Sequence, residues 1–263
     1  MEKLHVIKVG GNVLDNEPLL AKFLDDFAAI EDHKILIHGG GKIATTIADK
    51  LGIETKMIDG RRVTDEKTLE LVTMVYGGLI NKQLVASLQA RECNALGLTG
   101  ADGGLIPATK RPIKDGIDYG FAGDIIHARI KSSRLIPIIE GGFVPVFAPL
   151  TFSANGQMLN TNADSIASAL SVALSWSYRV SLHFCFEKNG VLRDVNNENS
   201  FIPRINEKEY MQLKAEGAII DGMIPKMDNA FEALRKGVDE VVIGHASNVL
   251  KAEGQIGTLV KMK

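Results

Sequence analysis

Cysteine and clusters of metal ligands are scarce in this chain. Its 263 residues include two cysteines, Cys93 and Cys185, and its six histidines show no pairing at metal-ligand spacing. This pattern excludes a disulfide framework and a cysteine zinc site, and it is typical of proteins from a reducing compartment. We therefore expect two buried thiols, no metal site and a cytoplasmic protein.

An excess of either charge is also missing. Thirty Lys and Arg residues stand against 32 Asp and Glu residues, which gives a net charge of −2. This near-balance excludes the broad basic field that non-specific nucleic-acid binding uses. Serines interrupt the most apolar stretch, residues 166–176, and residues 1–5 lack the apolar core of a signal peptide. We expect small-molecule partners, no nucleic acid and no membrane span.

Alternating strand and helix patterns fill the rest of the chain. With 45% hydrophobic residues and 24% charged residues, the composition is that of a globular protein. Apolar strand patterns alternate with amphipathic helical patterns, which indicates right-handed crossovers and a mainly parallel sheet covered on both faces. The predicted strands cover residues 4–9, 34–38, 95–98, 143–149, 180–186 and 241–243, with 257–260 closing the sheet.

Two segments between these strands have a distinct pattern. Residues 66–91 carry a long helical apolar stripe interrupted by Gly77 and Gly78, which cost roughly 1 kcal/mol each in a helix. The pair favours close backbone packing, so this helix is either a dimer interface or a core helix with a slight kink. Residues 113–130 have the punctuation of a hairpin outside the main sheet and form a candidate substrate lid.

Glycine clusters end the first two strands. Gly10 and Gly11 follow the first strand, and residues 39–41 follow the second, each before a predicted helix. Glycines let backbone N–H groups approach an anion, and a helix N-terminus adds partial positive charge. Two such turns at the carboxyl edge of a parallel sheet indicate a phosphate site.

The second turn also fits a relaxed dinucleotide fingerprint, from Gly39 to Ala44, with Asp59 about 20 residues on. A dehydrogenase is therefore an alternative. It is disfavoured because this fingerprint usually follows the first strand of a nucleotide-binding half, and because Asp59 lies in a turn. The chain has no P-loop motif.

Three charged residues suggest phosphoryl transfer. Lys8 lies within an apolar strand, Lys226 begins a predicted helix, and Asp164 lies at the start of another. Each alone has an ordinary explanation: an edge lysine, a solvated lysine and a helix cap. Together they form a set in which lysines neutralise the transferring group and the aspartate holds their ammonium groups.

Polar residues near these turns are candidate ligands for the substrate. Arg62 follows a turn where a guanidinium can clamp a carboxylate, and one of the two adjacent arginines, Arg61 or Arg62, is expected to be only solvated. Asn160 offers amide groups near Asp164, although Asn in a loop is often a turn former. His38 precedes the triple glycine, and we expect it to be structural.

Five motifs together resemble the acetylglutamate kinase branch of the amino acid kinase family, almost from end to end. They are Lys8-Val9-Gly10-Gly11, His38-Gly39-Gly40-Gly41, Gly60-Arg61-Arg62-Val63-Thr64, Asn160-Thr161-Asn162-Ala163-Asp164 and Asp221-Gly222-Met223-Ile224-Pro225-Lys226. The resemblance implies a three-layer αβα sandwich with a mainly parallel open central sheet. It also implies an acyl-amino-acid lobe, residues 1–178, and an ATP lobe, residues 179–263.

The implied reaction is phosphorylation of the γ-carboxylate of N-acetyl-L-glutamate by ATP, the second step of arginine biosynthesis. By this resemblance Lys8, Lys226 and Asp164 are catalytic, and Mg²⁺ arrives with ATP, bound mostly by phosphates and water. The residues implied to bind the acyl-amino acid are Gly40, Gly41, Arg62 and Asn160. Those implied to bind the phosphates and nucleotide are Gly10, Gly11, Glu187, Lys188, Asn189, Gly190, Val191, Leu192, Ala218, Ile219 and Ile220.

The chain departs from the family pattern at one place and leaves the acyl group open. Relatives commonly have Ser/Thr-Asp before the nucleotide turn, where this chain has Phe186-Glu187. N-succinyl-L-glutamate or another N-acyl glutamate is an alternative substrate, for which Arg61 or Lys114 would supply a further cation. A catalytically silent ligand sensor is a further alternative.

The start of the chain bears on regulation. Arginine-inhibited members carry an extra N-terminal helix, whereas here the first strand begins by about Leu4. We expect a homodimer that is insensitive to arginine.

Overall fold

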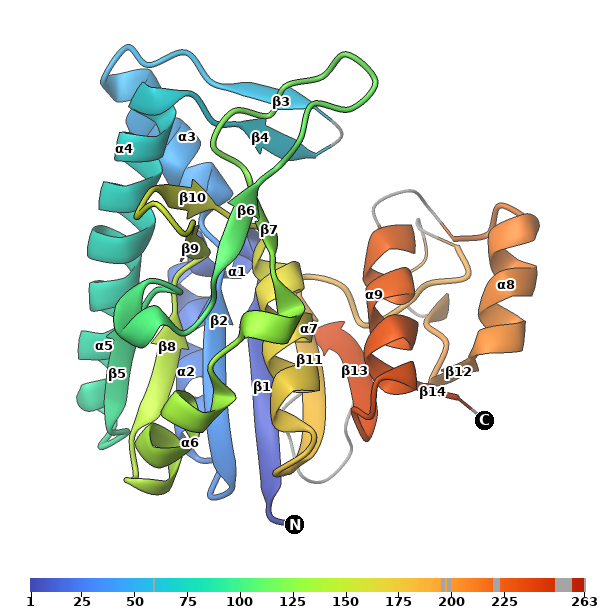
Figure 1. Cartoon of the computed structure of the whole chain (residues 1–263). Coiled ribbons are helices and arrows are strands. Elements are labelled where there is room, and N and C mark those ends of the chain that lie inside the picture. The colour runs from blue at the N-terminus through green and yellow to red at the C-terminus, as the bar shows by residue number, and fades with distance from the viewer. Residues whose placement is uncertain (59, 195–196, 198–199, 220–222, 249–256, 263) are drawn as a thin grey trace. The chain divides into compact units, whose positions relative to one another are not determined.

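The computed structural model describes residues 1–58, 60–194, 197, 200–219, 223–248 and 257–262 (Figure 1). Two compact units divide the chain: one combines Met1–Ile35 with Ala167–Lys263, and the other is Leu36–Ile166. The assignment of an acyl-amino-acid lobe and an ATP lobe stays a prediction. Asp59, Ile220, Asp221 and Gly222 lie outside the described residues.

The first unit is built on five strands in the order β12-β14-β13-β11-β1. Strand β11 pairs in parallel with both β1 and β13, while β14 is antiparallel to β13 and parallel to β12. Residues 180–185 of β11 are all buried, as expected for a strand that is covered on both faces. Their bounds are β1 Lys3–Val9, β11 Arg179–Phe186, β12 Arg204–Asn206, β13 Glu240–His245 and β14 Thr258–Lys261.

The helices of the first unit begin where the sequence supplies caps. Helix α2 starts after Asn16, whose side chain accepts a hydrogen bond from the Leu19 N–H, and Asn206 forms a capping box with Glu209 at the start of α8. Their bounds are α1 Gly11–Leu14, α2 Glu17–Ala28, α8 Glu207–Ala215 and α9 Ile224–Arg235; α7, Ala163–Leu174, crosses the boundary between the units.

The second unit contains the parallel strands β2-β8-β5 and three two-stranded antiparallel sheets. The strands are β2 His33–His38, β5 Ala95–Leu98 and β8 Val144–Phe147, and β2 begins in the first unit. The small sheets pair β3 Lys56–Ile58 with β4 Arg61–Val63, β6 Ala108–Lys110 with β7 Gly123–Ile125, and β9 Leu150–Phe152 with β10 Met158–Asn160. Its helices include α3 Gly41–Lys50 and α6 Ser132–Glu140, with 3₁₀ turns η2 Asp102–Gly104 and η3 His127–Arg129.

The long helix expected at residues 66–91 is present and changes type in its middle. It runs as α4 Glu66–Val72, a π-helical segment η1 Thr73–Ile80 and α5 Asn81–Gln89. The π segment contains both glycines, Gly77 and Gly78. Single π turns inside α-helices are rare and occur often at functional sites.

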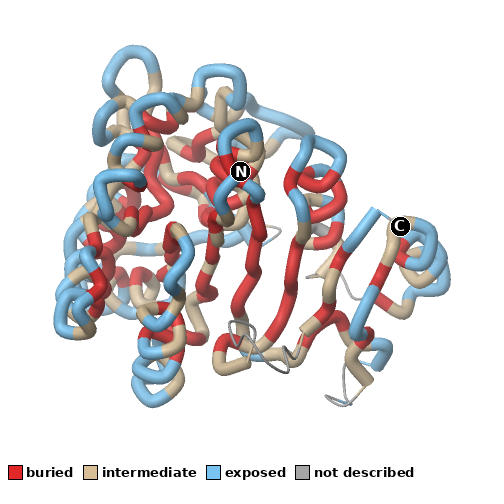
Figure 2. The backbone as a smooth tube through the Cα atoms, turned by 90° about the horizontal axis from the view of Figure 1, so that it is seen from below, coloured by how far each residue is buried: buried red, intermediate tan, exposed pale blue. Residues whose placement is uncertain are grey.

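Buried residues follow the strands, and exposed residues lie on the outer sides of helices and in loops (Figure 2). The predicted α/β fold with a mainly parallel sheet is confirmed. The expected hairpin near residues 113–130 is also separate from the main sheet, but its first strand is β6, so the hairpin starts earlier than predicted. Within the described residues, no helix is long and apolar enough to cross a bilayer.

Candidate functional site

The first glycine turn brings Lys8 beside the backbone at the end of β1. The Gly10 N–H donates to the Cys185 carbonyl at 3.0 Å, which ties the turn to the neighbouring strand β11. A methyl group placed on Gly10 would lie 4.0 Å from the Lys8 Nζ. The ammonium group and the backbone of the turn therefore occupy one small region, as an anion site requires.

Lys226 reaches the same part of the first unit from the other end of the chain. It lies in the first turn of α9, and its Nζ is 5.8 Å from the centre of the Phe184 ring. Phe184 is the residue of β11 that pairs with Lys8 in the parallel ladder. The two lysines, far apart in sequence, are thus neighbours of one buried aromatic ring.

The loop at residues 187–192, which we predicted to contact the nucleotide, follows β11. The Asn12 side-chain amide in α1 donates to the Glu187 Oε1 at 2.7 Å, so the carboxylate that replaces the family's aspartate lies beside the first glycine turn. At the other end of the loop, the Val191 N–H donates to the Thr258 hydroxyl at 2.8 Å. A methyl group on Gly190 would approach the same hydroxyl to 2.6 Å, so the close contact needs glycine.

Three further residues were predicted to contact the nucleotide, Ala218, Ile219 and Ile220. Ile219 is buried, and the Ala218 N–H donates to the Leu213 carbonyl at the end of α8. Ile220 is outside the described residues. Their contact with nucleotide stays a prediction.

The second glycine turn is shaped by residues far along the chain. Gly40 has a φ of +147°, and a methyl group there would collide with the Ile80 side chain and lie 3.2 Å from the Tyr76 ring. Both of those side chains belong to η1. The sequence did not predict that the π-helical segment packs on this turn.

Arg62 is buried beside the second glycine turn, with 7% of its surface exposed. One guanidinium nitrogen, Nη2, donates to the Gly41 carbonyl at 2.9 Å and to the Thr45 hydroxyl at 2.8 Å. The other, Nη1, is buried and has no hydrogen-bond partner among the described residues. A buried, unpaired cationic donor is costly, and an anionic ligand would satisfy it. Arg61, in contrast, is exposed, so it is the solvated one of the two adjacent arginines.

Asn160 is linked to Arg62 through Thr64. Its side-chain amide donates to the Thr64 hydroxyl at 2.9 Å, and that buried hydroxyl donates to the Arg62 carbonyl at 3.1 Å. The Asn160 N–H also bonds the Phe121 carbonyl in the loop between β6 and β7. The second unit therefore joins Gly40, Gly41, Arg62 and Asn160 into one cluster, and Thr64 is the connecting residue that sequence reasoning missed.

Asp164 lies in the first turn of α7, in the second unit. The capping role is taken by Asn162, whose side-chain oxygen accepts from the Ser165 N–H at 3.0 Å. Capping alone thus does not explain Asp164. Its predicted action on the two lysines stays a prediction.

The buried thiols and histidines are not suited to nucleophilic chemistry. Cys93 and Cys185 are both buried, as expected, and burial raises the pKa of the Cys185 thiol. His38 is fully buried, and desolvation lowers its pKa to about 4. In the part of the chain that the structure describes, no three His, Cys, Asp or Glu residues group closely enough to hold a metal ion.

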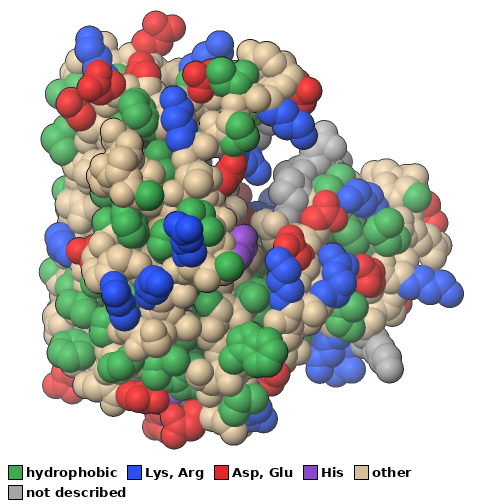
Figure 3. Space-filling view, in the orientation of Figure 1, with side chains coloured by type: hydrophobic (Ala, Val, Ile, Leu, Met, Phe, Trp, Pro, Cys, Tyr) green, Lys and Arg blue, Asp and Glu red, His purple; other side chains and the backbone are tan. Residues whose placement is uncertain are grey.

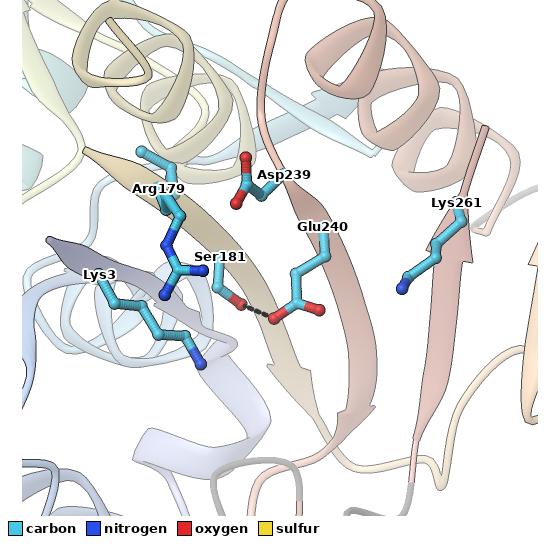
Figure 4. Close-up of a pocket in the computed structure, with 7 residues that line it drawn as sticks. Lys3, Arg179, Ser181, Asp239, Glu240 and Lys261 are labelled. Atoms are coloured by element: carbon cyan, nitrogen blue, oxygen red, sulfur yellow. Dashed lines mark hydrogen bonds between the residues drawn. The ribbon is translucent and has the colours of Figure 1, made fainter. Parts of the chain in front are cut away.

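A separate hollow of about 260 Å³ opens at the amino ends of β1, β11 and β13 (Figure 4). Lys3, Arg179 and Lys261 line it together with Asp239 and Glu240, and Ser181 donates to Glu240 at 2.9 Å. None of the predicted site residues lines this hollow. Elsewhere, basic and acidic side chains are interspersed on the face seen in Figure 3.

Comparison with known proteins gives consistent matches. The model of the amino acid kinase family matches residues 3–245. An acetylglutamate kinase of Cytophaga hutchinsonii is 54% identical over 251 residues, covering 95% of this chain and 94% of the relative. One from Bacteroides fragilis is 57% identical over 248 residues, which is 94% of each chain.

Solved structures share the fold at lower identity. The protein smu.665 of Streptococcus mutans has a TM-score of 0.78 at 26% identity, with 99% of each chain covered. The N-acetylglutamate synthase of Neisseria gonorrhoeae, solved with coenzyme A and N-acetyl-glutamate, has a TM-score of 0.84 at 20% identity and covers 100% of this chain and 60% of its own. At that identity the second match supports the fold alone.

Proposed function

Because this chain belongs to the amino acid kinase family, we propose that it transfers the γ-phosphoryl group of ATP to the γ-carboxylate of N-acetyl-L-glutamate. Relatives that are 54% and 57% identical over nearly the whole chain carry the name acetylglutamate kinase. The product, an acyl phosphate, belongs to arginine biosynthesis. The observation that carries the proposal is the buried Arg62 with its unpaired Nη1.

The acyl-amino acid would bind at the cluster in the second unit. A guanidinium with one open nitrogen suits the α-carboxylate of the substrate, since arginine binds carboxylates through parallel hydrogen bonds. Gly40, Gly41 and Asn160 would supply backbone and amide groups. This arrangement supports an anionic amino-acid derivative over a neutral one.

The chemical step needs little from acid–base groups. A γ-carboxylate oxygen attacks the γ-phosphorus, the bond to the β–γ bridging oxygen breaks, and ADP leaves. The nucleophile is already ionised at neutral pH, so alignment and charge neutralisation carry catalysis. We assign neutralisation to Lys8 and Lys226, the organisation of their ammonium groups to Asp164, and backbone donors to Gly10 and Gly11.

ATP would contact two segments, the loop at residues 187–192 and residues 218–220. Mg²⁺ would be held chiefly by phosphate and water oxygens. The protein would act as a homodimer in the cytoplasm, through the helix of residues 66–89. The exposed apolar side chains of η1, Met74 and Leu79, support an interface there.

A coupled assay of ADP release tests the function. We expect turnover with N-acetyl-L-glutamate and none with glutamate or aspartate. N-succinyl-L-glutamate belongs in the same panel because Arg61 and Lys114, the cations considered for a larger acyl group, are both exposed. Faster turnover with N-succinyl-L-glutamate would make that compound, and not N-acetyl-L-glutamate, the preferred substrate. No ADP release with any of the four compounds would overturn the proposal.

A further inference from the structure

The candidate for a further role is His38, a fully buried residue at the end of β2. Its Nδ1 lies 2.7 Å from the carbonyl oxygen of Gly39. Its Nε2 lies 3.3 Å from the side-chain amide nitrogen of Asn81, in α5. Both ring nitrogens are therefore occupied within the protein, and neither is available to a substrate.

These contacts determine the tautomer. A carbonyl oxygen can only accept, so the proton must be on Nδ1, and Nε2 then accepts from Asn81. The second Asn81 amide hydrogen is used by the Val146 carbonyl at 2.9 Å, and the Asn81 oxygen accepts from Lys82 at 3.2 Å. The position of each proton follows from its partner, and the ring is neutral.

Holding the Gly39 carbonyl also orients the next peptide N–H. In a trans peptide the C=O and the N–H point in opposite directions across one plane. The Gly39–Gly40 peptide has glycine on both sides, so its backbone alone restricts it little. With the carbonyl bound to His38, the Gly40 N–H must face away from the imidazole.

We infer that His38 is a positioning residue whose Nδ1–H fixes the Gly39–Gly40 peptide so that the Gly40 N–H is ready to donate to the bound acyl-amino acid. This inference rests on the proposed function, because it takes Gly40 as a substrate-binding residue. Asn81 supports His38 by keeping the proton on Nδ1. His38 itself does not touch the substrate.

Two substitutions at His38 separate the contacts. His38→Asn places an amide nitrogen close to the Nδ1 position and so keeps a donor for Gly39, while the Nε2 contact is lost. His38→Gln places its amide near the Nε2 position, where it can still meet Asn81, but it removes the donor on Gly39. Both variants remove the imidazole ring and leave a cavity in its place, so each is a control for the effect of the cavity in the other.

We expect His38→Asn to keep kcat/KM for N-acetyl-L-glutamate within about threefold, and His38→Gln to lower it by about tenfold to a hundredfold, since small misplacements of binding groups cost that much. The KM for ATP should stay unchanged in both. Equal losses in the two variants, or losses that follow the melting temperature, would overturn the inference.

A measurement on the wild-type protein covers the case in which the variants fail to fold. The ¹⁵N shifts of the His38 ring at neutral pH should report a protonated Nδ1 and an unprotonated Nε2. A proton on Nε2 would overturn the inference whatever the substrate proves to be. If the tautomer is as expected and ADP release is absent, the proposed function fails and the positioning contact stands.

Discussion

Adjacent arginines in β4 have opposite environments because successive side chains of a strand point to opposite faces. Arg61 is exposed, whereas Arg62 is buried with its Nη2 on the Gly41 carbonyl. A buried guanidinium needs several acceptors, and although the hydroxyl groups of Thr45 and Tyr76 lie beside it, Nη1 has no hydrogen-bond partner among the described residues. The unpaired Nη1 favours the prediction that Arg62 binds a ligand, because an arginine that only stabilises the fold is expected to have its buried N–H groups paired.

Replacing Lys8 tests the catalytic assignment. We expect Lys8→Ala to lower kcat by about 10² to 10³, as for the loss of one preorganised electrostatic donor, with little change in melting temperature. Lys22→Ala is the matched control, because Lys22 is an exposed lysine whose ion pair with Asp26 lies within helix α2. ADP release measures both variants, and wild-type turnover in Lys8→Ala would remove Lys8 from the mechanism.

Replacing Gly40 with alanine is expected to affect both stability and substrate binding. A methyl group there would collide with Ile80 and require a φ of +147°, which side chains rarely adopt. We expect Gly40→Ala to lower the free energy of unfolding by about 1–3 kcal/mol and to raise the KM for N-acetyl-L-glutamate by tenfold or more. Denaturant titration and ADP release measure the two effects.

A second-site change shows whether the collision is the cause. Ile80→Val removes the methyl group that lies in the way and by itself costs about 0.5–1.5 kcal/mol. In the double variant the two losses should therefore be less than additive. Strictly additive losses would show that the Ile80 contact is not responsible.

At the scale of elements, the helix of residues 66–89 shows what a pattern can and cannot predict. The apolar stripe predicted its length, and the glycine pair left two alternatives, close packing at a dimer interface or a core helix with a slight kink. The π-helical form of η1 did not follow, because a wider turn is selected by what the side chains pack against. Here Tyr76 and Ile80 pack on Gly40, which is distant in sequence.

This element is also where we expect the second subunit. Met74 in η1 and Met211 in α8 are nearly equally exposed in the single chain, at 59% and 57%. A carboxylate buried in an apolar interface is costly, whereas the same group in water is not. Met74→Asp should therefore convert the dimer to monomer, and Met211→Asp should leave it intact.

Light scattering across a dilution series measures the effect. Both substitutions replace an exposed methionine with the same charged residue, so solubility and net charge change equally. A dimer that survives Met74→Asp would place the interface on another element. A protein that is monomeric before any substitution would refute the homodimer itself.

For the molecule as a whole, alternation of strand and helix patterns was enough to predict a mainly parallel α/β fold. The same local reasoning placed Lys8 and both glycine turns at strand ends. It did not find Thr64, Thr258 or Asn81, because their value lies in partners that are distant along the chain. Buried hydroxyl and amide groups join a site through the tertiary fold, which periodicity does not encode.

The global response to acid depends on buried histidines in both units. Besides His38, two further histidines contact each other: the Nδ1 of His5 lies 3.0 Å from the Nε2 of His183. Burial, followed by nearby Lys3, lowers the pKa of His5, and burial holds the pKa of His183 well below its ordinary value. Protonating both rings would place two N–H donors against each other, so this pair is stable only while it is not fully charged.

We therefore expect the free energy of unfolding to be highest above about pH 6.5 and to fall as the pH drops below that value. The unfolded chain then binds protons at histidines near their ordinary pKa of 6.5, while the folded chain does not. His38 alone, with a pKa of about 4, should account for roughly 3 kcal/mol between pH 6.5 and pH 4. Denaturant titrations at a series of pH values measure how the free energy of unfolding changes with pH.

His38→Asn removes one of the three histidines with a lowered pKa and should reduce the slope of the free energy of unfolding between pH 6 and pH 5 by about 1 kcal/mol per pH unit. An unchanged slope in that variant would mean that His38 binds a proton as readily in the folded protein as in the unfolded chain. That result would contradict the neutral ring inferred from the contacts with Gly39 and Asn81.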